Sequence, residues 1–246
     1  MSFDQAERVA DVRRALDRVT DPELDEPVTD LRFIEDLTVD LNGSVSIGFR
    51  LPTYWCAANF AFLMAADMQR EVAAIPWVTH VRVTLGEHMY GDKINHGLAN
   101  GLSFRATFGN EASAELDELR RVFLVKAFQR RQETLLRHLL ASGQDPAFLV
   151  SMPVDDLRAA ESDLQRRYLD RRDVCAAPGE PLAFVDADGS PIPAENLLSY
   201  LQTLGRITIN AEFNGALCRG LLAARFGEDG EPTLYDFARM PPSKAA

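Results

Sequence analysis

Two β-type runs joined by Asn42-Gly43, within the segment FIEDLTVDLNGSVSIGFRL, constrain the fold of this chain more than any other feature. Asn-Gly readily adopts the positive φ angles of a tight hairpin turn. The two runs are therefore predicted to form a β-hairpin. This is the strongest local structural signal in the sequence, and the neighbouring elements are placed relative to it.

Helical and strand patterns flank the hairpin. Residues 4–19 are predicted to form an amphipathic helix, because apolar residues recur there at helical spacing. Residues 56–74 are rich in Ala, Met, Leu and Phe and predict a mostly buried helix that ends before Pro76. The segment WVTHVRVTL alternates as a third strand. Residues 1–86 thus read α-β-β-α-β, an α+β domain with a small three-stranded sheet and two helices.

The rest of the chain has a different character. Residues 87–109 are Gly-rich and are predicted to be a junction. Residues 110–246 are predicted to be a mainly α-helical C-terminal domain, with Gly143 as a helix C-cap and separate helices at 194–204 and 207–226. The last segment, PTLYDFARMPPSKAA, is predicted to be a flexible tail.

Composition excludes several classes of protein. The chain has 246 residues and a formal net charge of −11, which disfavours binding to nucleic acid or to an anionic membrane. No secretory signal pattern and no apolar run of about 18 residues occurs, so a cytoplasmic location without membrane insertion is expected. Three cysteines without a CxxC pair predict neither a disulfide framework nor a self-contained zinc or cluster site.

The N-terminal third contains, in this order, the segment DPELDEPVTDLRFIEDLTVD, the Asn-Gly hairpin, the loop from Thr53 to Cys56 and a V-x-V-x-L strand at residues 81–85. In these motifs it resembles the SufT-type, PaaD-like iron-sulfur cluster assembly domain family. Two departures stand out: Arg32 occupies a position where the family usually has Gly, and Ala57 follows the loop cysteine where Pro is usual. The loop RLPTYWCAANF, with its long extension, resembles the versions that accompany bacterial di-iron monooxygenase operons.

Cys56 is the main candidate for a functional residue. In the first turn of a helix, the free N–H groups and the macrodipole favour a thiolate, which can ligate a metal or attack an electrophile. From the residues alone, a small buried hydrophobic side chain is the alternative. The resemblance favours the functional role: Cys56 as transfer ligand, Thr53 orienting it, and Asp21 and Glu23 as supporting carboxylates.

This residue set is incomplete as a metal site. Iron-sulfur clusters normally require four thiolates or their His substitutes, so a cluster would be shared with a partner protein or with a second subunit of a homodimer. A mononuclear iron or zinc site completed by His88 or His96 stays open, as does an ordinary solvated role for both histidines. Cys218, on a predicted helix, is assigned to core packing.

These observations predict a non-catalytic factor. The resemblance implies that it transiently holds iron or an iron-sulfur cluster and assists the maturation of a client metalloenzyme, such as a di-iron monooxygenase, with the helical extension recognising the client. Two alternatives remain: a metal-free chaperone or scaffold for an oxygenase subunit, and a thiol-dependent enzyme, which needs a base near Cys56.

Overall fold

The computed structural model describes residues 3–109, 116–159 and 162–226. It divides into two compact units, each with its own hydrophobic core. The first contains the described residues up to Leu116 together with 214–226, and the second contains 117–213. The tail predicted for residues 232–246 lies outside the described residues.

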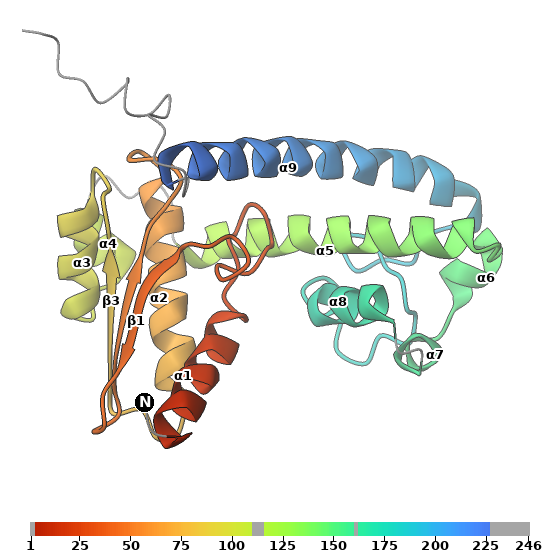
Figure 1. Cartoon of the computed structure of the whole chain (residues 1–246). Coiled ribbons are helices and arrows are strands. Elements are labelled where there is room, and N and C mark those ends of the chain that lie inside the picture. The colour runs from red at the N-terminus through yellow and green to blue at the C-terminus, as the bar shows by residue number, and fades with distance from the viewer. Residues whose placement is uncertain (1–2, 110–115, 160–161, 227–246) are drawn as a thin grey trace, which may run out of the picture. The chain divides into compact units, whose positions relative to one another are not determined.

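The first unit contains the predicted order α-β-β-α-β (Figure 1). These elements are α1 (Phe3–Leu16), β1 (Ile34–Val39), β2 (Ser44–Phe49), α2 (Ala58–Ala73) and β3 (His80–Leu85), and two further helices follow them, α3 (Gly91–Ala99) and α4 (Phe104–Phe108). The prediction of a small three-stranded sheet with helices is confirmed.

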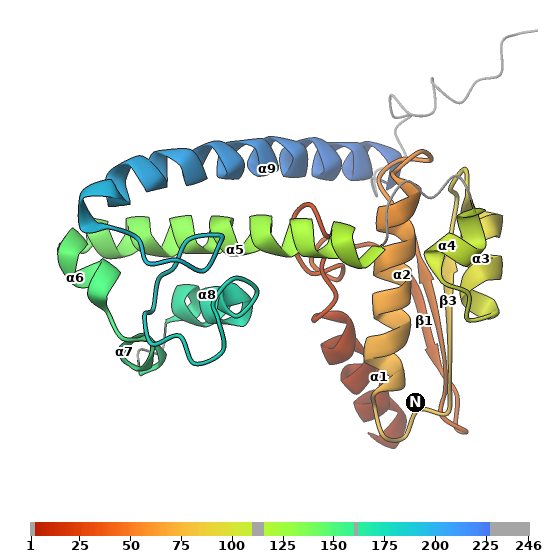
Figure 2. The same ribbon diagram turned by 180° about the vertical axis from the view of Figure 1, so that it is seen from behind.

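The sheet has the strand order β1-β2-β3 and is mixed. β1 and β2 pair antiparallel, as a hairpin must, whereas β2 and β3 pair parallel. Parallel neighbours need a crossover connection, and α2 provides it. Strand β3 alternates between exposed and buried residues from His80 onward, so one face of the sheet covers the core. Helices α1 and α2 lie on the same side of the sheet (Figures 1 and 2).

The predicted hairpin is confirmed, but its turn is longer than a two-residue one. Within the turn at residues 40–43, only Gly43 has a positive φ angle, of 86°. The Asp40 carboxylate accepts hydrogen bonds from the N–H groups of Asn42 (2.9 Å) and Ser44 (2.7 Å). A Cβ atom at Gly43 would lie 2.4 Å from the carbonyl oxygen of Trp77. Glycine is therefore required both by backbone conformation and by close packing.

Arg32 has a left-handed backbone, with φ of 56°. Its N–H donates to the Thr29 carbonyl at 3.0 Å, and the next N–H, of Phe33, donates to Val28 at 2.9 Å. The chain turns sharply here before it enters β1. This conformation explains why glycine suits the position in the family that the sequence resembles.

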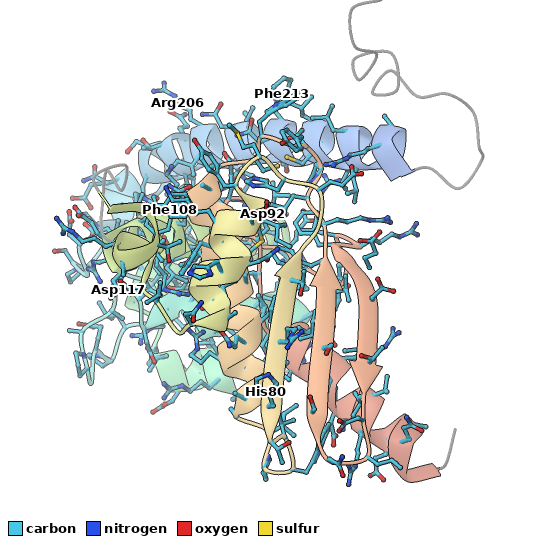
Figure 3. The ribbon with its side chains drawn as sticks, turned by 90° about the vertical axis from the view of Figure 1, so that its left-hand side faces the viewer. His80, Asp92, Phe108, Asp117, Arg206 and Phe213 are labelled. Atoms are coloured by element: carbon cyan, nitrogen blue, oxygen red, sulfur yellow. The ribbon has the colours of Figure 1, made fainter. Side chains whose placement is uncertain are left out.

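Residues 87–109, predicted as a junction, contain two helices. Helix α3 packs beside β3 (Figure 3) and buries Ile94 and Leu98, and α4 buries Phe104 and Phe108. Both helices belong to the first unit. The boundaries at residues 86 and 110 themselves stay a prediction.

The second unit is helical. It contains α5 (Leu116–Ala141) from its second residue, α6 (Pro146–Ser151), α7 (Val154–Arg158), α8 (Asp163–Arg172), the 3-10 helix η2 (Ala194–Asn196) and the first part of α9 (Leu197–Phe226). Gly143, with φ of 87°, follows α5 as predicted. The prediction of separate helices at 194–204 and 207–226 is wrong, because α9 runs on through Gly205.

A buried polar network joins the elements of the second unit. The Gln132 amide donates to the Val185 carbonyl (2.7 Å) and accepts from the Tyr200 hydroxyl (2.6 Å), and the Tyr168 hydroxyl donates to Ala183 (2.8 Å). Such satisfied networks fix one packing arrangement. Within the described part of the chain, no helix has both the length and the apolar character of a membrane span.

Candidate functional site

Cys56 lies in the loop between β2 and α2. Helix α2 begins at Ala58 with Ala57 as its N-cap, so the prediction that Cys56 occupies the first helical turn is wrong by two residues. The loop is short and includes the exposed aromatic residues Tyr54 and Trp55. The Cys56 side chain is half-buried, and its Sγ lies 3.0 Å from the Thr53 hydroxyl. Thr53 is therefore within hydrogen-bonding distance of the thiol, and its role in orienting a transfer ligand stays a prediction.

His88 holds the backbone of this loop. The Tyr90 N–H donates a hydrogen bond to His88 Nδ1 at 3.1 Å, so the proton of the neutral ring is on Nε2. The Nε2–H donates a hydrogen bond to the Cys56 carbonyl at 2.8 Å. Burial lowers the pKa of His88, and the charge of Arg225 lowers it too. The hydrogen bond to the Cys56 carbonyl acts in the opposite direction. Both ring nitrogens are thus engaged. The Met89 N–H adds a bond to the Tyr54 carbonyl at 2.8 Å.

Asp21 and Glu23 lie in the turn after α1. The Asp21 carboxylate accepts hydrogen bonds from the N–H groups of Glu23 (2.9 Å) and Leu24 (2.8 Å). Burial, helped by the nearby charges of Glu23 and Glu26, raises the pKa of Asp21 to about 6 despite these two bonds. The two residues therefore form a hydrogen-bonded turn, with one carboxylate that titrates near pH 6, and their support of Cys56 stays a prediction.

Cys218, assigned from the sequence to core packing alone, lies near this set. It is half-buried on α9 and packs, with Leu222, against the core of the first unit. Burial raises the pKa of the Cys218 thiol to about 11, and the negative charges of Asp21, Cys56 and Glu23 act in the same direction. The structure thus brings a second thiol close to the predicted residues.

The signal for Cys218 was absent from its local sequence. Its own segment predicts only a helix, and the apolar neighbours Leu217 and Leu221 are in fact exposed. The residues that place Cys218 are polar side chains on α9 that bond to loops about 190 residues earlier in the chain. Pattern reasoning within one segment does not reveal such pairings.

The other predicted metal ligand, His96, is exposed on α3, where its Nδ1 lies 3.4 Å from the Asn100 side chain. Among the described residues, no group of three or more His, Cys, Asp or Glu side chains is arranged to hold a metal ion. Metal ligation by Cys56, His88 or His96 stays a prediction. The charges of Asp21, Glu23 and Cys56 act on Cys218, and two thiols suit a metal or cluster that takes its remaining ligands elsewhere.

Comparisons with known proteins concern the N-terminal part of the chain. A crystal structure similar to part of the chain is that of a domain of unknown function, DUF59, from Bacillus anthracis, with 23% identity, a TM-score of 0.32, and coverage of 34% of this chain and 77% of that chain. A search of curated proteins gave no match. Residues 9–85 match the model of the family described as iron-sulfur cluster assembly protein. The chain therefore carries an iron-sulfur assembly-type domain at its N-terminus.

Proposed function

We propose that this protein is a non-catalytic maturation factor that takes up iron or an iron-sulfur cluster as cargo and passes it to a client metalloenzyme. The observation that carries the proposal is the position of Cys56. Its thiol lies on a loop that is fixed by Thr53 and His88, within the domain that matches the assembly family. A half-buried thiol on a fixed loop of this domain favours a role as transfer ligand.

The loop geometry fits transfer better than permanent storage. Cys56 is half-buried beside the exposed side chains of Tyr54 (42% exposed) and Trp55 (63% exposed). A thiolate that is partly open to solvent can exchange its metal with a second protein, whereas stable cluster binding uses four thiolates in one site. Exposed aromatic residues are also enriched at protein interfaces, so the same loop is suited to client contact.

The proposed client is a di-iron monooxygenase. This follows from the resemblance of the loop RLPTYWCAANF and its extension to the versions found with such enzymes. Client recognition is assigned to the helical part of the chain, where α5 contributes a run of basic residues between Arg120 and Arg137. Basic residues at the rim of an interface accelerate association with an acidic partner and make it sensitive to salt.

One observation favours a second function, that of a metal-free chaperone or scaffold. Four apolar residues spaced by four along α9 are exposed: Ile209, Phe213, Leu217 and Leu221. Phe213 is labelled on α9 in Figure 3. Residues at this spacing share one side of a helix, and an apolar stripe of this kind is a means of holding a protein partner. A scaffold of this type would not need the Cys56 thiol.

The experiment that separates the two functions replaces Cys56 with Ser in cells that produce the monooxygenase client. Hydroxylase activity and the iron content of the purified client are measured, with Cys175→Ser in the second unit as the matched control. For a maturation factor, Cys56→Ser abolishes client activation and lowers client iron, and the control has no effect. Full activity with normal client iron in the Cys56→Ser strain would remove the transfer function and leave the scaffold.

A further inference from the structure

Residues 214–226 of α9 bond to loops in the N-terminal part of the first unit, through polar contacts on both sides of Cys218. Four residues before it, the Asn214 amide donates to the Glu23 carboxylate at 2.8 Å. Seven residues after it, Arg225 donates to the Leu51 carbonyl at 2.9 Å and to the Glu87 carboxylate at 2.9 Å, with its side chain only 2% exposed. Positions separated by four and by eleven residues share a helix face. Cys218 therefore faces the first unit.

The loops that receive the Arg225 contacts are the ones that hold Cys56. Leu51 opens the β2–α2 loop, and Glu87 directly precedes His88, whose ring binds the Cys56 carbonyl. Arg225 thus joins the two segments that fix Cys56 in place. Both cysteines also pack against the same hydrophobic core. Arg225 therefore links the helix that carries Cys218 to the two segments that fix Cys56, and both thiols lie against one core.

A third contact fixes the register of the helix. Arg219, adjacent to Cys218, donates to both carboxylate oxygens of Glu26, at 2.9 and 3.0 Å. Both bonds come from one guanidinium nitrogen, Nη1, so they hold Arg219 at Glu26 without the two-nitrogen geometry of a bidentate pair. The position of Cys218 is therefore defined by charged and amide side chains on either side of it, in addition to apolar packing.

We propose that Cys218 is the second thiolate ligand of the Cys56 site, so that the chain offers two sulfur ligands to a thiophilic metal such as iron(II) or to a small iron-sulfur cluster. This rests on the proposed function and adds to it the ligand that the family-type domain lacks. Each thiol loses its proton as a metal–sulfur bond forms, so uptake of one divalent ion releases two protons and involves no change of oxidation state.

Two thiolates have a consequence for transfer. They supply half of the four sulfur ligands that a cluster requires, and the other half comes from a client or from a second copy of this chain. A site with half of its ligands in place binds cargo and still leaves coordination positions for the recipient. One thiol alone would bind much more weakly.

Cobalt(II) is the metal probe for this proposal, because its sulfur-to-cobalt charge-transfer absorption grows with the number of thiolate ligands. The full-length protein is titrated without oxygen, alongside Cys56→Ser, Cys218→Ser, the double variant and Cys175→Ser as control. We expect each single variant to lose about half of the absorption, the double variant to lose all of it, and the control to match the wild type.

The outcomes separate this inference from the proposed function. Wild-type absorption in Cys218→Ser together with its loss in Cys56→Ser would overturn the second-ligand role and leave Cys56 as a transfer ligand. Full absorption in both single variants, or none in the wild type, would overturn both.

A second measurement needs no variant and covers the case in which Cys218→Ser fails to fold. Phenylarsine oxide binds two neighbouring thiols together, forming two arsenic–sulfur bonds and releasing one water. One equivalent is expected to protect Cys56 and Cys218 from alkylation and to leave Cys175 reactive, as read by peptide mass spectrometry. Alkylation of both site cysteines in the presence of the arsenical would show that the thiols are too far apart and would overturn the proposal.

Discussion

Replacing Asp21 with Asn tests the energetic cost of the buried carboxylate beside the two thiols. The amide oxygen of Asn can still accept the N–H groups of Glu23 and Leu24, so the turn keeps its hydrogen bonds while the charge disappears. Burial raises the pKa of Asp21 from 3.8 to about 6. At about 1.36 kcal/mol for each pKa unit, the ionised side chain costs the folded state roughly 3 kcal/mol.

The sign of the pH dependence follows from the direction of the shift. Below pH 3.8 Asp21 is protonated in the folded and unfolded states alike, and its stabilising contribution is fully present. As the pH rises through about 6, the folded state must give up the proton it holds more tightly, and roughly 3 kcal/mol is lost. The Asn variant has no such loss. We expect the free energy of unfolding of the Asn variant to exceed that of the wild type by up to about 3 kcal/mol at pH 8, and by about half as much at pH 5.

Urea denaturation followed by circular dichroism at pH 8, 6.5 and 5 measures this difference. Asp36→Asn, which neutralises an exposed carboxylate on β1, is the matched control and should show no comparable gain. The reasoning would be refuted if Asp21→Asn were less stable than the wild type at pH 8, or if the difference between the two proteins did not change with pH.

Four further outcomes are expected. Gly43→Ala should lower the free energy of unfolding by more than the about 1–2 kcal/mol that a left-handed conformation costs, because the new Cβ also meets the backbone. The control Gly101→Ala, with φ of 63° and open space around it, should show only the conformational cost, and equal losses in urea denaturation would contradict this. Arg32→Gly should gain up to about 1 kcal/mol by the same measurement, since its exposed side chain holds a left-handed backbone, and a loss would show that the arginine makes a stabilising contact. Brief iodoacetamide treatment should label Cys56 before the other two cysteines, because burial raises the pKa of both other thiols; mass spectrometry showing Cys56 unlabelled while another cysteine reacts would favour a buried structural role. Truncation before residue 214 should lower the melting temperature of the first unit, because it removes Cys218 and Leu222 from its core, and an unchanged value would argue against that packing.

The sequence was sufficient for the features that depend on local pattern. The hairpin follows from Asn42-Gly43 and two β-type runs, and α2 follows from a dense apolar segment. His88 was singled out from the sequence as a residue that could meet Cys56, and its ring does bond to the Cys56 carbonyl. In each case the residues that determine the structure lie in or beside the element that they form.

Other features depend on partners that are distant along the chain. Helix α9 continues through Gly205, although one glycine costs a helix about 1 kcal/mol, because the packing of Leu201 and Leu204 in the second core outweighs that cost. The neighbourhood of Cys218 depends on Asn214 and Arg219 meeting carboxylates 191 and 193 residues away. Neither outcome has a signature within its own segment.

The contact between α9 and the Cys56 loop also affects how the protein matures on the ribosome. Cys56 and Cys218 are 162 residues apart. At a synthesis rate of about 5–20 residues per second, Cys218 is made roughly 8–32 s after Cys56. The nascent domain therefore has Cys56 as its single thiol until Cys218 is synthesised, and until then Arg219 and Arg225 are not present to bind α9 to the loops. The order of synthesis makes the loop cysteine open to modification or premature metal capture early, and brings the second thiol to it only when the chain is nearly complete.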